Sequence, residues 1–299
     1  MMNRKRRGAL TLALAFAALA PGLPGGIAAA AAFDPAPLAA AVDHIGSRLP
    51  ARVGVAVLDT ETGKSWSHLG DERFPLNSTF KAFLCAALLD KGEAGDLDPG
   101  SRVKIHREDL VSYSPVTEKK VGSGGMTLLE LCEATVTISD NAAANLVFEQ
   151  IGGPDGLNGF LRRIGDMHTR LDRLEPGLNS GHPGDDRDTT TPVAAAATLE
   201  KLLLGDALST GARAQLIRWM EGNKVGDSTL RAGLPQEWRI ADKTGAGGNG
   251  SRNDIGVIWP TGRAPVVIAV YITGTSASFE ARNAAIAEIG AALADSLVD

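Results

Sequence analysis

The distribution of strand-like segments along this 299-residue chain is the feature that most constrains its fold. Alternating apolar and polar residues, the pattern of a half-buried strand, occur near the N-terminus and again after Trp238. The predicted strands are residues 52–58, 64–69, 239–243, 254–259 and 266–272. A single sheet would therefore be assembled from two distant parts of the chain.

Between these two groups of strands, apolar residues follow helical spacing, and no strand is expected from Ser78 to about Glu221. The predicted helices are residues 37–49, 79–89, 128–137, 141–151, 157–164, 193–203, 211–220 and 277–297. The pattern predicts an inserted all-helical domain, residues 70–221, within a sheet-and-helix domain formed by residues 33–69 and 222–299. Ligand sites are common at such domain junctions.

Residues 1–32 have the pattern of a secretory signal peptide. Four basic residues at positions 4–7 precede an apolar run at 9–20, and small residues suited to cleavage follow near Ala30 or Ala32. The run is shorter than the roughly 18 residues that span a bilayer, so no membrane anchor is expected. The sequence predicts a periplasmic or secreted protein, exported by the Sec or the twin-arginine route.

Charge and histidine spacing argue against several classes of function. The formal net charge is −5, and it becomes −9 without residues 1–32, which contain four basic residues and no acidic residue. A nucleic-acid-binding protein would normally carry a clustered basic patch, so no nucleic-acid partner is expected. The histidines show no zinc-binding spacing, and neither a nucleophile elbow nor a P-loop is present. We therefore expect no metal and no cofactor.

Cys85 and Cys132 are the only cysteines of the chain. Export into an oxidising compartment favours a disulfide between them. Closing a loop of this length would contribute about 4 kcal/mol to stability in the chain-entropy model. The alternative is a pair of buried thiols.

A serine and a lysine stand three residues apart in Ser78-Thr79-Phe80-Lys81. Ser78 would lie at the start of a helix, with Lys81 one turn further along on the same face. This spacing gives a serine nucleophile a nearby base. The alternative is a serine that caps the helix and a lysine exposed to solvent.

A short polar turn, Ser139-Asp140-Asn141, separates two predicted helices. The Ser139 hydroxyl is a candidate for passing a proton to a leaving nitrogen, and the Asn141 amide for holding a substrate carbonyl. Asp140 would fix the turn. The alternative is an ordinary helix cap.

A third motif, Lys243-Thr244-Gly245, ends a predicted strand. The ammonium and hydroxyl groups suit a substrate carboxylate, and Gly245 would allow another backbone to approach closely. The N–H of Ala246 is a candidate oxyanion donor, and Arg252 is a candidate second cation. The alternative role for Lys243 is to protect an exposed sheet edge.

A long aperiodic segment follows Arg173 and ends after Asp188, which is typical of a functional loop. Within it, Glu175 is a candidate general base for a water molecule held jointly by the Asn179 amide. Arg173 and Asp188 are candidates for an ion pair that clamps the two ends of the loop. The alternative is a solvated loop with incidental charges.

These four motifs, in this order, resemble the signature motifs of the class A serine β-lactamases. Further similar stretches are Ser112-Tyr113-Ser114-Pro115-Val116, Arg187-Asp188-Thr189-Thr190, Trp238-Arg239-Ile240-Ala241-Asp242 and Arg282-Asn283. The resemblance covers essentially the whole chain after residue 32. It implies an α/β fold of the α+β type, the β-lactamase/transpeptidase-like fold, with an antiparallel, roughly five-stranded sheet between N- and C-terminal helices and an inserted all-α domain.

The resemblance also implies roles for individual residues in a monomeric enzyme that hydrolyses penicillins and cephalosporins. The implied catalytic residues are Ser78 as nucleophile, Ser78 and Ala246 N–H as oxyanion hole, Lys81 and Ser139 as proton relay, and Glu175 with Asn179 for the deacylating water. The implied substrate-binding residues are Tyr113, Asn141, Lys243, Thr244, Gly245 and Arg252. The pair Cys85 and Cys132 matches a disulfide found in part of the family. Either Lys81 or Glu175 would be the base for acylation.

Two other classes of function share parts of this pattern. A penicillin-binding transpeptidase or carboxypeptidase has the same serine, lysine and Lys-Thr-Gly chemistry but lacks the pair Glu175 and Asn179. A non-catalytic β-lactam- or peptidoglycan-binding module would use the same pocket without turnover. The glycines at 177, 247, 248 and 250 predict a flexible pocket margin that admits bulky cephalosporins.

Overall fold

The computed structural model describes residues 33–297. The predicted signal peptide, residues 1–32, lies outside the described residues. None of the helices within residues 33–297 has the length and apolar character that a membrane-spanning helix requires.

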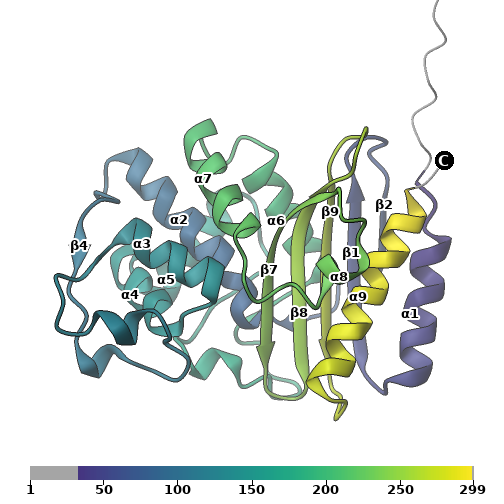
Figure 1. The fold of residues 1–299 in the computed structure, drawn as a ribbon, viewed down its shortest axis with the longest axis horizontal. Coiled ribbons are helices and arrows are strands. Elements are labelled where there is room, and N and C mark those ends of the chain that lie inside the picture. The colour runs from purple at the N-terminus through teal and green to yellow at the C-terminus, as the bar shows by residue number, and fades with distance from the viewer. Residues whose placement is uncertain (1–32, 298–299) are drawn as a thin grey trace, which may run out of the picture. The chain divides into compact units, whose positions relative to one another are not determined.

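A five-stranded antiparallel sheet with the strand order β2-β1-β9-β8-β7 forms the centre of the fold (Figure 1). Its strands are β1 (Arg52–Asp59), β2 (Ser65–His68), β7 (Arg239–Gly247), β8 (Ser251–Trp259) and β9 (Val266–Thr273). Strands from the two distant parts of the chain meet where β1 pairs with β9, in the register Val55 to Val270. The predicted α+β fold with a sheet assembled from both groups of strands is confirmed.

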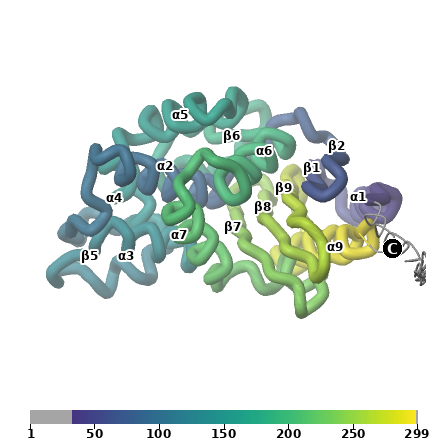
Figure 2. The backbone as a smooth tube through the Cα atoms, turned by 90° about the horizontal axis from the view of Figure 1, so that it is seen from above, coloured from purple at the N-terminus to yellow at the C-terminus, as the bar shows by residue number. Residues whose placement is uncertain are grey.

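Helices pack on both faces of this sheet and beside it. They are α1 (Ala36–Arg48), α2 (Phe80–Ala94), α3 (Leu128–Glu133), α4 (Asn141–Ile151), α5 (Gly153–Arg163), α6 (Pro192–Leu203), α7 (Thr210–Glu221), α8 (Leu230–Gly233) and α9 (Phe279–Ser296). Figure 2 shows α6 on one side of the sheet and α9 on the other. Alternation along β1 explains how the sheet covers two cores: Val55 and Val57 pack with α1 and α9, whereas Ala56 belongs to the core that contains α2 and α6.

Helix α2 lies at the centre of the second core. Ten consecutive residues, 80–89, are buried, so the helix is enclosed on all sides over this length. Phe80 stacks on Phe148 of α4 with the ring centroids 5.4 Å apart. A disulfide joins Cys85 of α2 to Cys132 of α3, with the Cα atoms 5.6 Å apart. The predicted disulfide is thus confirmed, and the alternative of two free thiols is excluded.

The expectation that no strand occurs between residues 78 and 221 is wrong. Strand β4 (Arg102–Val103) pairs with β5 (Met126–Thr127), and β6 (Thr189–Thr190) pairs with β3 (Phe74–Pro75). Each of these strands has two residues, which is too short for the apolar alternation by which a strand is detected in a sequence.

The strands that border the glycine-rich segment are longer than predicted. Strand β7 continues to Gly247 and β8 begins at Ser251, and these two residues are paired. The glycines at 245, 247, 248 and 250 lower the strand propensity of this segment, so its sequence predicts a loop. The extension is relevant to function because Gly245, Ala246 and Arg252 all lie in it.

Candidate active site

A cavity of about 420 Å³ lies where the start of α2, the turn before α4, the loop before β6 and the adjacent ends of β7, β8 and α9 meet. Its lining residues are Ser78, Tyr113, Ser139, Asn141, Asn179, Val225, Ser228, Thr244, Gly245, Ala246, Arg252 and Phe279. Residues from all four predicted motifs therefore contribute to a single site, either in this lining or directly behind it.

Ser78 lies in a short 3-10 turn (Asn77–Thr79) that leads into the N-terminus of α2. The preceding Asn77 has a φ of 44° and is buried. Its side chain connects two elements of the site, because Asn77 Oδ1 accepts a hydrogen bond from Asn253 Nδ2 at 3.1 Å and Asn77 Nδ2 faces Asn179 Oδ1 at 3.5 Å. The positive end of the helix dipole near Ser78 favours negative charge in the cavity.

Lys81 is completely buried behind Ser78, so the alternative of a solvent-exposed lysine is excluded. Its Nζ lies 3.1 Å from Glu175 Oε1 and donates to Asn141 Oδ1 at 2.5 Å and to the Ser139 carbonyl at 2.8 Å. Burial lowers the pKa of Lys81, and the Glu175 carboxylate opposes this shift. Within residues 33–297 no hydrogen bond joins Lys81 Nζ to the Ser78 hydroxyl.

The Ser139-Asp140-Asn141 turn directs its members to different tasks. Ser139 has a φ of 66° in the left-handed region, and Asp140 is the N-cap of α4. The Asp140 carboxylate accepts from the backbone N–H of Ala143 at 2.8 Å and of Thr117 at 3.0 Å. Asp140 therefore fixes the turn, while Ser139 and Asn141 face the cavity.

The loop that carries Glu175 places this carboxylate beside Asn179. Asn179 Nδ2 donates to Glu175 Oε2 at 2.5 Å. The Glu175-Pro176 peptide bond is cis. The side-chain amide of Asn145 in α4 binds both backbone polar groups of Glu175. Its Oδ1 accepts from Glu175 N at 3.0 Å, and its Nδ2 donates to Glu175 O at 2.9 Å. The sequence analysis missed Asn145, although its position one helical turn after Asn141 places both on the same face of α4.

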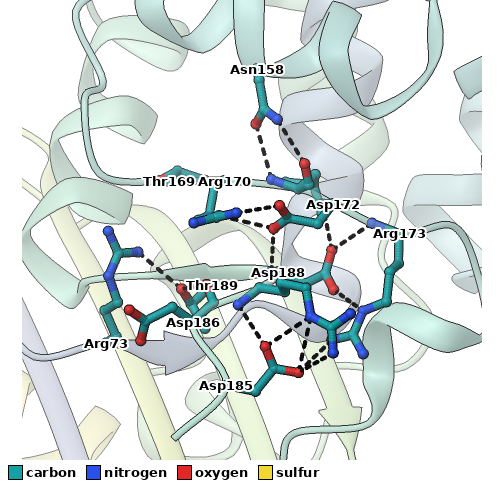
Figure 3. A network of polar contacts seen from close by, with 12 residues as sticks. Arg73, Asn158, Thr169, Arg170, Asp172, Arg173, Asp185, Asp186, Asp188 and Thr189 are labelled. Carbon is teal, nitrogen blue, oxygen red and sulfur yellow. Dashed lines mark hydrogen bonds and ion pairs between the residues drawn. The ribbon is translucent and has the colours of Figure 1, made fainter.

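The two ends of this loop are joined by a network of charged side chains (Figure 3). Arg173 Nε lies 2.5 Å from Asp188 Oδ2, which is the ion pair expected from the sequence. Asp188 Oδ1 also accepts from the backbone N–H of Asp172 at 2.7 Å. Hydrogen bonds from Arg187 are the main cause of the lowered pKa of Asp185, which also faces Arg173. The alternative of incidental loop charges is excluded by this connected arrangement.

Strand β7 brings a second lysine, Lys243, close to the hydroxyl of Ser139. Lys243 Nζ lies 3.2 Å from Ser139 Oγ and donates to the Thr244 carbonyl at 2.9 Å. Ser139 Oγ is also 3.4 Å from Lys81 Nζ, so it lies between two ammonium groups. Burial first, and then the nearby Lys81 charge, lower the pKa of Lys243 to about 7. A completely buried lysine does not protect a sheet edge, which excludes the alternative role.

Arg252 of β8 stands opposite Ala246 of β7 in the sheet register. Its Nε donates to Asn283 Oδ1 at 2.6 Å, and its Nη1 donates to the Gly245 carbonyl at 3.3 Å. No carboxylate within residues 33–297 forms an ion pair with it. Burial lowers the pKa of Arg252. Strand β8 therefore presents the Arg252 cation to the cavity. The hydrogen-bond partners of this cation in the protein are neutral groups.

The glycines around the cavity allow close packing. A Cβ at Gly245 would lie 3.1 Å from Ser78 N, and one at Gly248 would lie 2.1 Å from the Ser180 carbonyl oxygen. A Cβ at Gly247 would lie 2.7 Å from the Asn179 carbonyl oxygen. The glycines at 247 and 248 therefore have a packing role that the sequence did not predict, because a side chain at either position would meet neighbouring backbone.

Tyr113 lines the opposite side of the cavity, with 56% of its surface exposed and a φ of 61°. Three further lining residues, Val225, Ser228 and Phe279, were not identified from the sequence. Val225 and Ser228 lie in an aperiodic segment, and Phe279 is a single apolar residue at a helix start. None of these positions carries a sequence pattern specific to a ligand site.

Comparisons with known proteins identify the family of this chain. A family model described as the β-lactamase enzyme family matches residues 37–297. The chain is 53% identical to β-lactamase AER-1 of Aeromonas hydrophila over 89% of this chain and 88% of that protein. It is 46% identical to β-lactamase L2 of Stenotrophomonas maltophilia over 91% of this chain and 90% of that protein.

Solved structures show the same relationship. The ancestral Gram-negative (GNCA) class A β-lactamase is 56% identical and superposes with a TM-score of 0.85, covering 86% of this chain and 99% of that one. The class A β-lactamase PenP of Rhodopseudomonas palustris, described as putative, is 48% identical with a TM-score of 0.84, covering 86% and 98%. With a site in which Ser78, Lys81 and Glu175 adjoin one cavity, the chain belongs to the class A β-lactamase family.

Proposed function

We propose that this chain hydrolyses the β-lactam amide of penicillins and cephalosporins through an acyl-enzyme formed on Ser78. The observation that carries the proposal is the completely buried Lys81–Glu175 pair, 3.1 Å apart, behind a serine that lines the cavity. A nucleophile, a proton-accepting pair and an anion-binding wall are thereby present in one site. Membership of the family connects this chemistry to resistance against β-lactam antibiotics.

Acylation begins with attack of Ser78 Oγ on the β-lactam carbonyl carbon. The backbone N–H groups of Ser78 and Ala246 stabilise the resulting oxyanion. The Ser78 proton passes to the Lys81–Glu175 pair. Ser139 donates its proton to the leaving nitrogen as the carbon–nitrogen bond breaks, and Lys81 returns a proton to Ser139 Oγ. The position of Ser139 Oγ, 3.4 Å from Lys81 Nζ and 3.2 Å from Lys243 Nζ, supports this relay.

Deacylation uses water on the side of the site where Glu175 lies. Glu175 removes a proton from the water, whose oxygen attacks the ester carbon. Ser78 Oγ then leaves, and the proton returns to it from Glu175 through Lys81. The Asn179 amide, 2.5 Å from Glu175 Oε2, orients the water together with the carboxylate. Neither a metal nor a cofactor has a role in this sequence of steps.

Substrate binding is assigned to the side chains that surround these groups. Lys243, Thr244 and Arg252 bind the drug carboxylate, while Tyr113 forms a wall of the site. Asn141 Nδ2 donates to the Ser112 carbonyl at 2.8 Å, which leaves its second N–H for the carbonyl of the substrate side chain. The absence of a carboxylate partner for Arg252 within residues 33–297 supports its role as an anion receptor.

We further propose that the protein acts as a monomer in the periplasm or outside the cell. The disulfide between Cys85 and Cys132 supports an oxidising location. We retain the division into a sheet-and-helix domain, residues 33–69 with 222–299, and an inserted helical domain, residues 70–221. The cavity would then lie between the two domains.

Intact-protein mass spectrometry with benzylpenicillin tests the proposed function. Wild-type protein should form only a transient adduct while the drug is consumed, and Ser78→Ala should show neither adduct nor turnover. A wild-type adduct that lasts for hours would instead favour a penicillin-binding transpeptidase or carboxypeptidase. Unchanged drug with no adduct would indicate a module that binds β-lactams without reacting.

A further inference from the structure

Phe279 is an apolar side chain at the margin of the cavity to which the mechanism above gives no task. It is the first residue of α9, whose N-cap is Ser278, and 44% of its surface is exposed. It also lines the cavity. Single exposed apolar side chains are common on protein surfaces, so the informative feature of Phe279 is its place in the cavity lining beside Arg252.

The first turn of α9 surrounds the guanidinium group of Arg252. The Arg252 Cζ atom lies 4.8 Å from the Phe279 ring centroid, and Arg252 Nε donates to Asn283 Oδ1 at 2.6 Å. Phe279 and Asn283 are four residues apart and therefore lie on the same face of the helix. The ring and the amide thus act together to fix the proposed carboxylate receptor.

A second arginine contacts the same ring. Arg282 Cζ lies 5.6 Å from the Phe279 centroid, and this guanidinium is held by the carbonyls of Ser251 and Ser278, each at 3.2 Å. Two cations beside the negative face of one ring reduce its freedom to move. A side chain that is already ordered loses little entropy when a ligand contacts it.

We propose that Phe279 is a specificity-determining residue that binds the substrate substituent next to the carboxylate, with a preference for aromatic groups. The inference rests on the proposed function, because it needs the drug carboxylate to bind at Arg252. In cephalosporins the carbon adjacent to the carboxylate-bearing carbon carries the C3 substituent. A substrate whose carboxylate contacts Arg252 therefore directs this substituent toward the ring that packs against the same guanidinium.

The test compares two cephalosporins with the same acylamino side chain, one with an aromatic C3 substituent and one with a C3 methyl group. In Phe279→Ala, the ratio of kcat/KM for the aromatic over the methyl compound should fall about fivefold, mainly through KM, as the loss of one aromatic contact predicts. Phe279→Leu, which retains most of the volume, should lower the ratio less. Met167→Ala is the control, because Met167 is 67% exposed and does not line the cavity.

Each outcome decides the proposal. An equal loss for both compounds would mean that Phe279 only positions Arg252, and an unchanged ratio would mean that it does not contact the substituent. Either result overturns the inference while leaving the proposed function intact. Wild-type protein that hydrolyses benzylpenicillin but neither cephalosporin would overturn this inference alone, whereas failure on benzylpenicillin as well would overturn the proposed function. Thermal unfolding of both variants separates a folding defect from a change in specificity.

Discussion

The two walls of the cavity handle charge in different ways. The helical wall, formed by α2, the 139–141 turn and the loop with Glu175, pairs its ammonium group: Lys81 Nζ lies 3.1 Å from the Glu175 carboxylate. The strand wall, formed by β7 and β8, carries Lys243 and Arg252, whose hydrogen-bond partners are a hydroxyl, carbonyls and an amide. The ammonium group of the helical wall thus has a carboxylate in direct contact, whereas neither Lys243 nor Arg252 forms an ion pair within residues 33–297, and the buried Asp242 and Asp254 of the same strands act on them only from a distance.

This difference shows that the groups in contact with a buried lysine, and not the residue type alone, determine which chemical role the lysine can have. Both Lys81 and Lys243 are completely buried, both have a pKa lowered by burial, and both lie near Ser139 Oγ. The carboxylate beside Lys81 can exchange a proton with it, which suits acid–base chemistry. Lys243 has no carboxylate in direct contact, which suits the proposed binding of a substrate anion.

Removing the ammonium group from the helical wall should have the largest effect. Lys81→Met should lower kcat about 10³-fold, because the proton relay is lost. It should also lower the free energy of unfolding by about 3 kcal/mol, because Glu175 would remain buried without its cation. Both are measured by steady-state kinetics and urea denaturation, with Lys91→Met on the same helix as control. If the double variant Lys81→Met/Glu175→Gln did not recover part of the lost stability, the pairing would be contradicted.

Removing a cation from the strand wall should act on KM instead. Arg252→Ala should raise KM for benzylpenicillin about 30-fold, as expected for loss of a charge-assisted hydrogen bond, with a much smaller change in kcat. Arg239→Ala provides the control, because this arginine lies on the neighbouring strand β7 but is exposed and paired with Glu221. A loss confined to kcat would show that the two walls do not divide binding from chemistry.

Two glycine substitutions should show that the contact between the walls is tight. In Gly248→Ala, the new Cβ would lie 2.1 Å from the Ser180 carbonyl oxygen, so the loop that carries Asn179 must move. We expect kcat to fall about tenfold, because the deacylating water is then misplaced. Gly177→Ala is the matched control, since its Cβ would meet no atom within 4 Å. Equal effects of the two changes on kcat would contradict the close-packing explanation.

The smallest expected effect is a pH dependence on the strand wall. Lys243 has a pKa of about 7, so it is protonated below this pH and neutral above it. Because a charged donor binds a carboxylate more strongly than a neutral one, kcat/KM should fall about threefold as the pH rises from about 6 to 8.5. Lys243→Arg should remove this fall, since arginine stays protonated throughout. A kcat/KM that rises over the same range in both proteins would exclude Lys243 as the titrating group.

Much of the fold follows from local patterns in the sequence. Periodicity identifies the long helices and the five strands of the central sheet, because each buries one or both faces over many residues. The same reasoning fails for β4, β5 and β6, since two paired residues do not create a period. It also ends β7 and β8 too early, because the glycines that lower strand propensity are retained for contacts with Ser78 and Ser180.

The site shows a similar limit. The motifs identify the chemical groups, but the position of Ser139 between two lysines depends on contacts across 58 and 104 residues of sequence. Asn145 and Phe279 were missed because each acts through a partner far along the chain, Glu175 in one case and Arg252 in the other. Sequence spacing carries no information about such tertiary contacts.

The central claim is that Ser78 forms the acyl-enzyme and Glu175 activates the water that removes the acyl group. The most direct test is time-resolved intact-protein mass spectrometry of Glu175→Gln with benzylpenicillin, beside wild type and the control Glu72→Gln, whose carboxylate is exposed. Glutamine keeps the size of the side chain but does not accept the proton. We predict an adduct that accumulates on Ser78 and persists only in Glu175→Gln. Release of the acyl group from this variant at the wild-type rate would contradict the account.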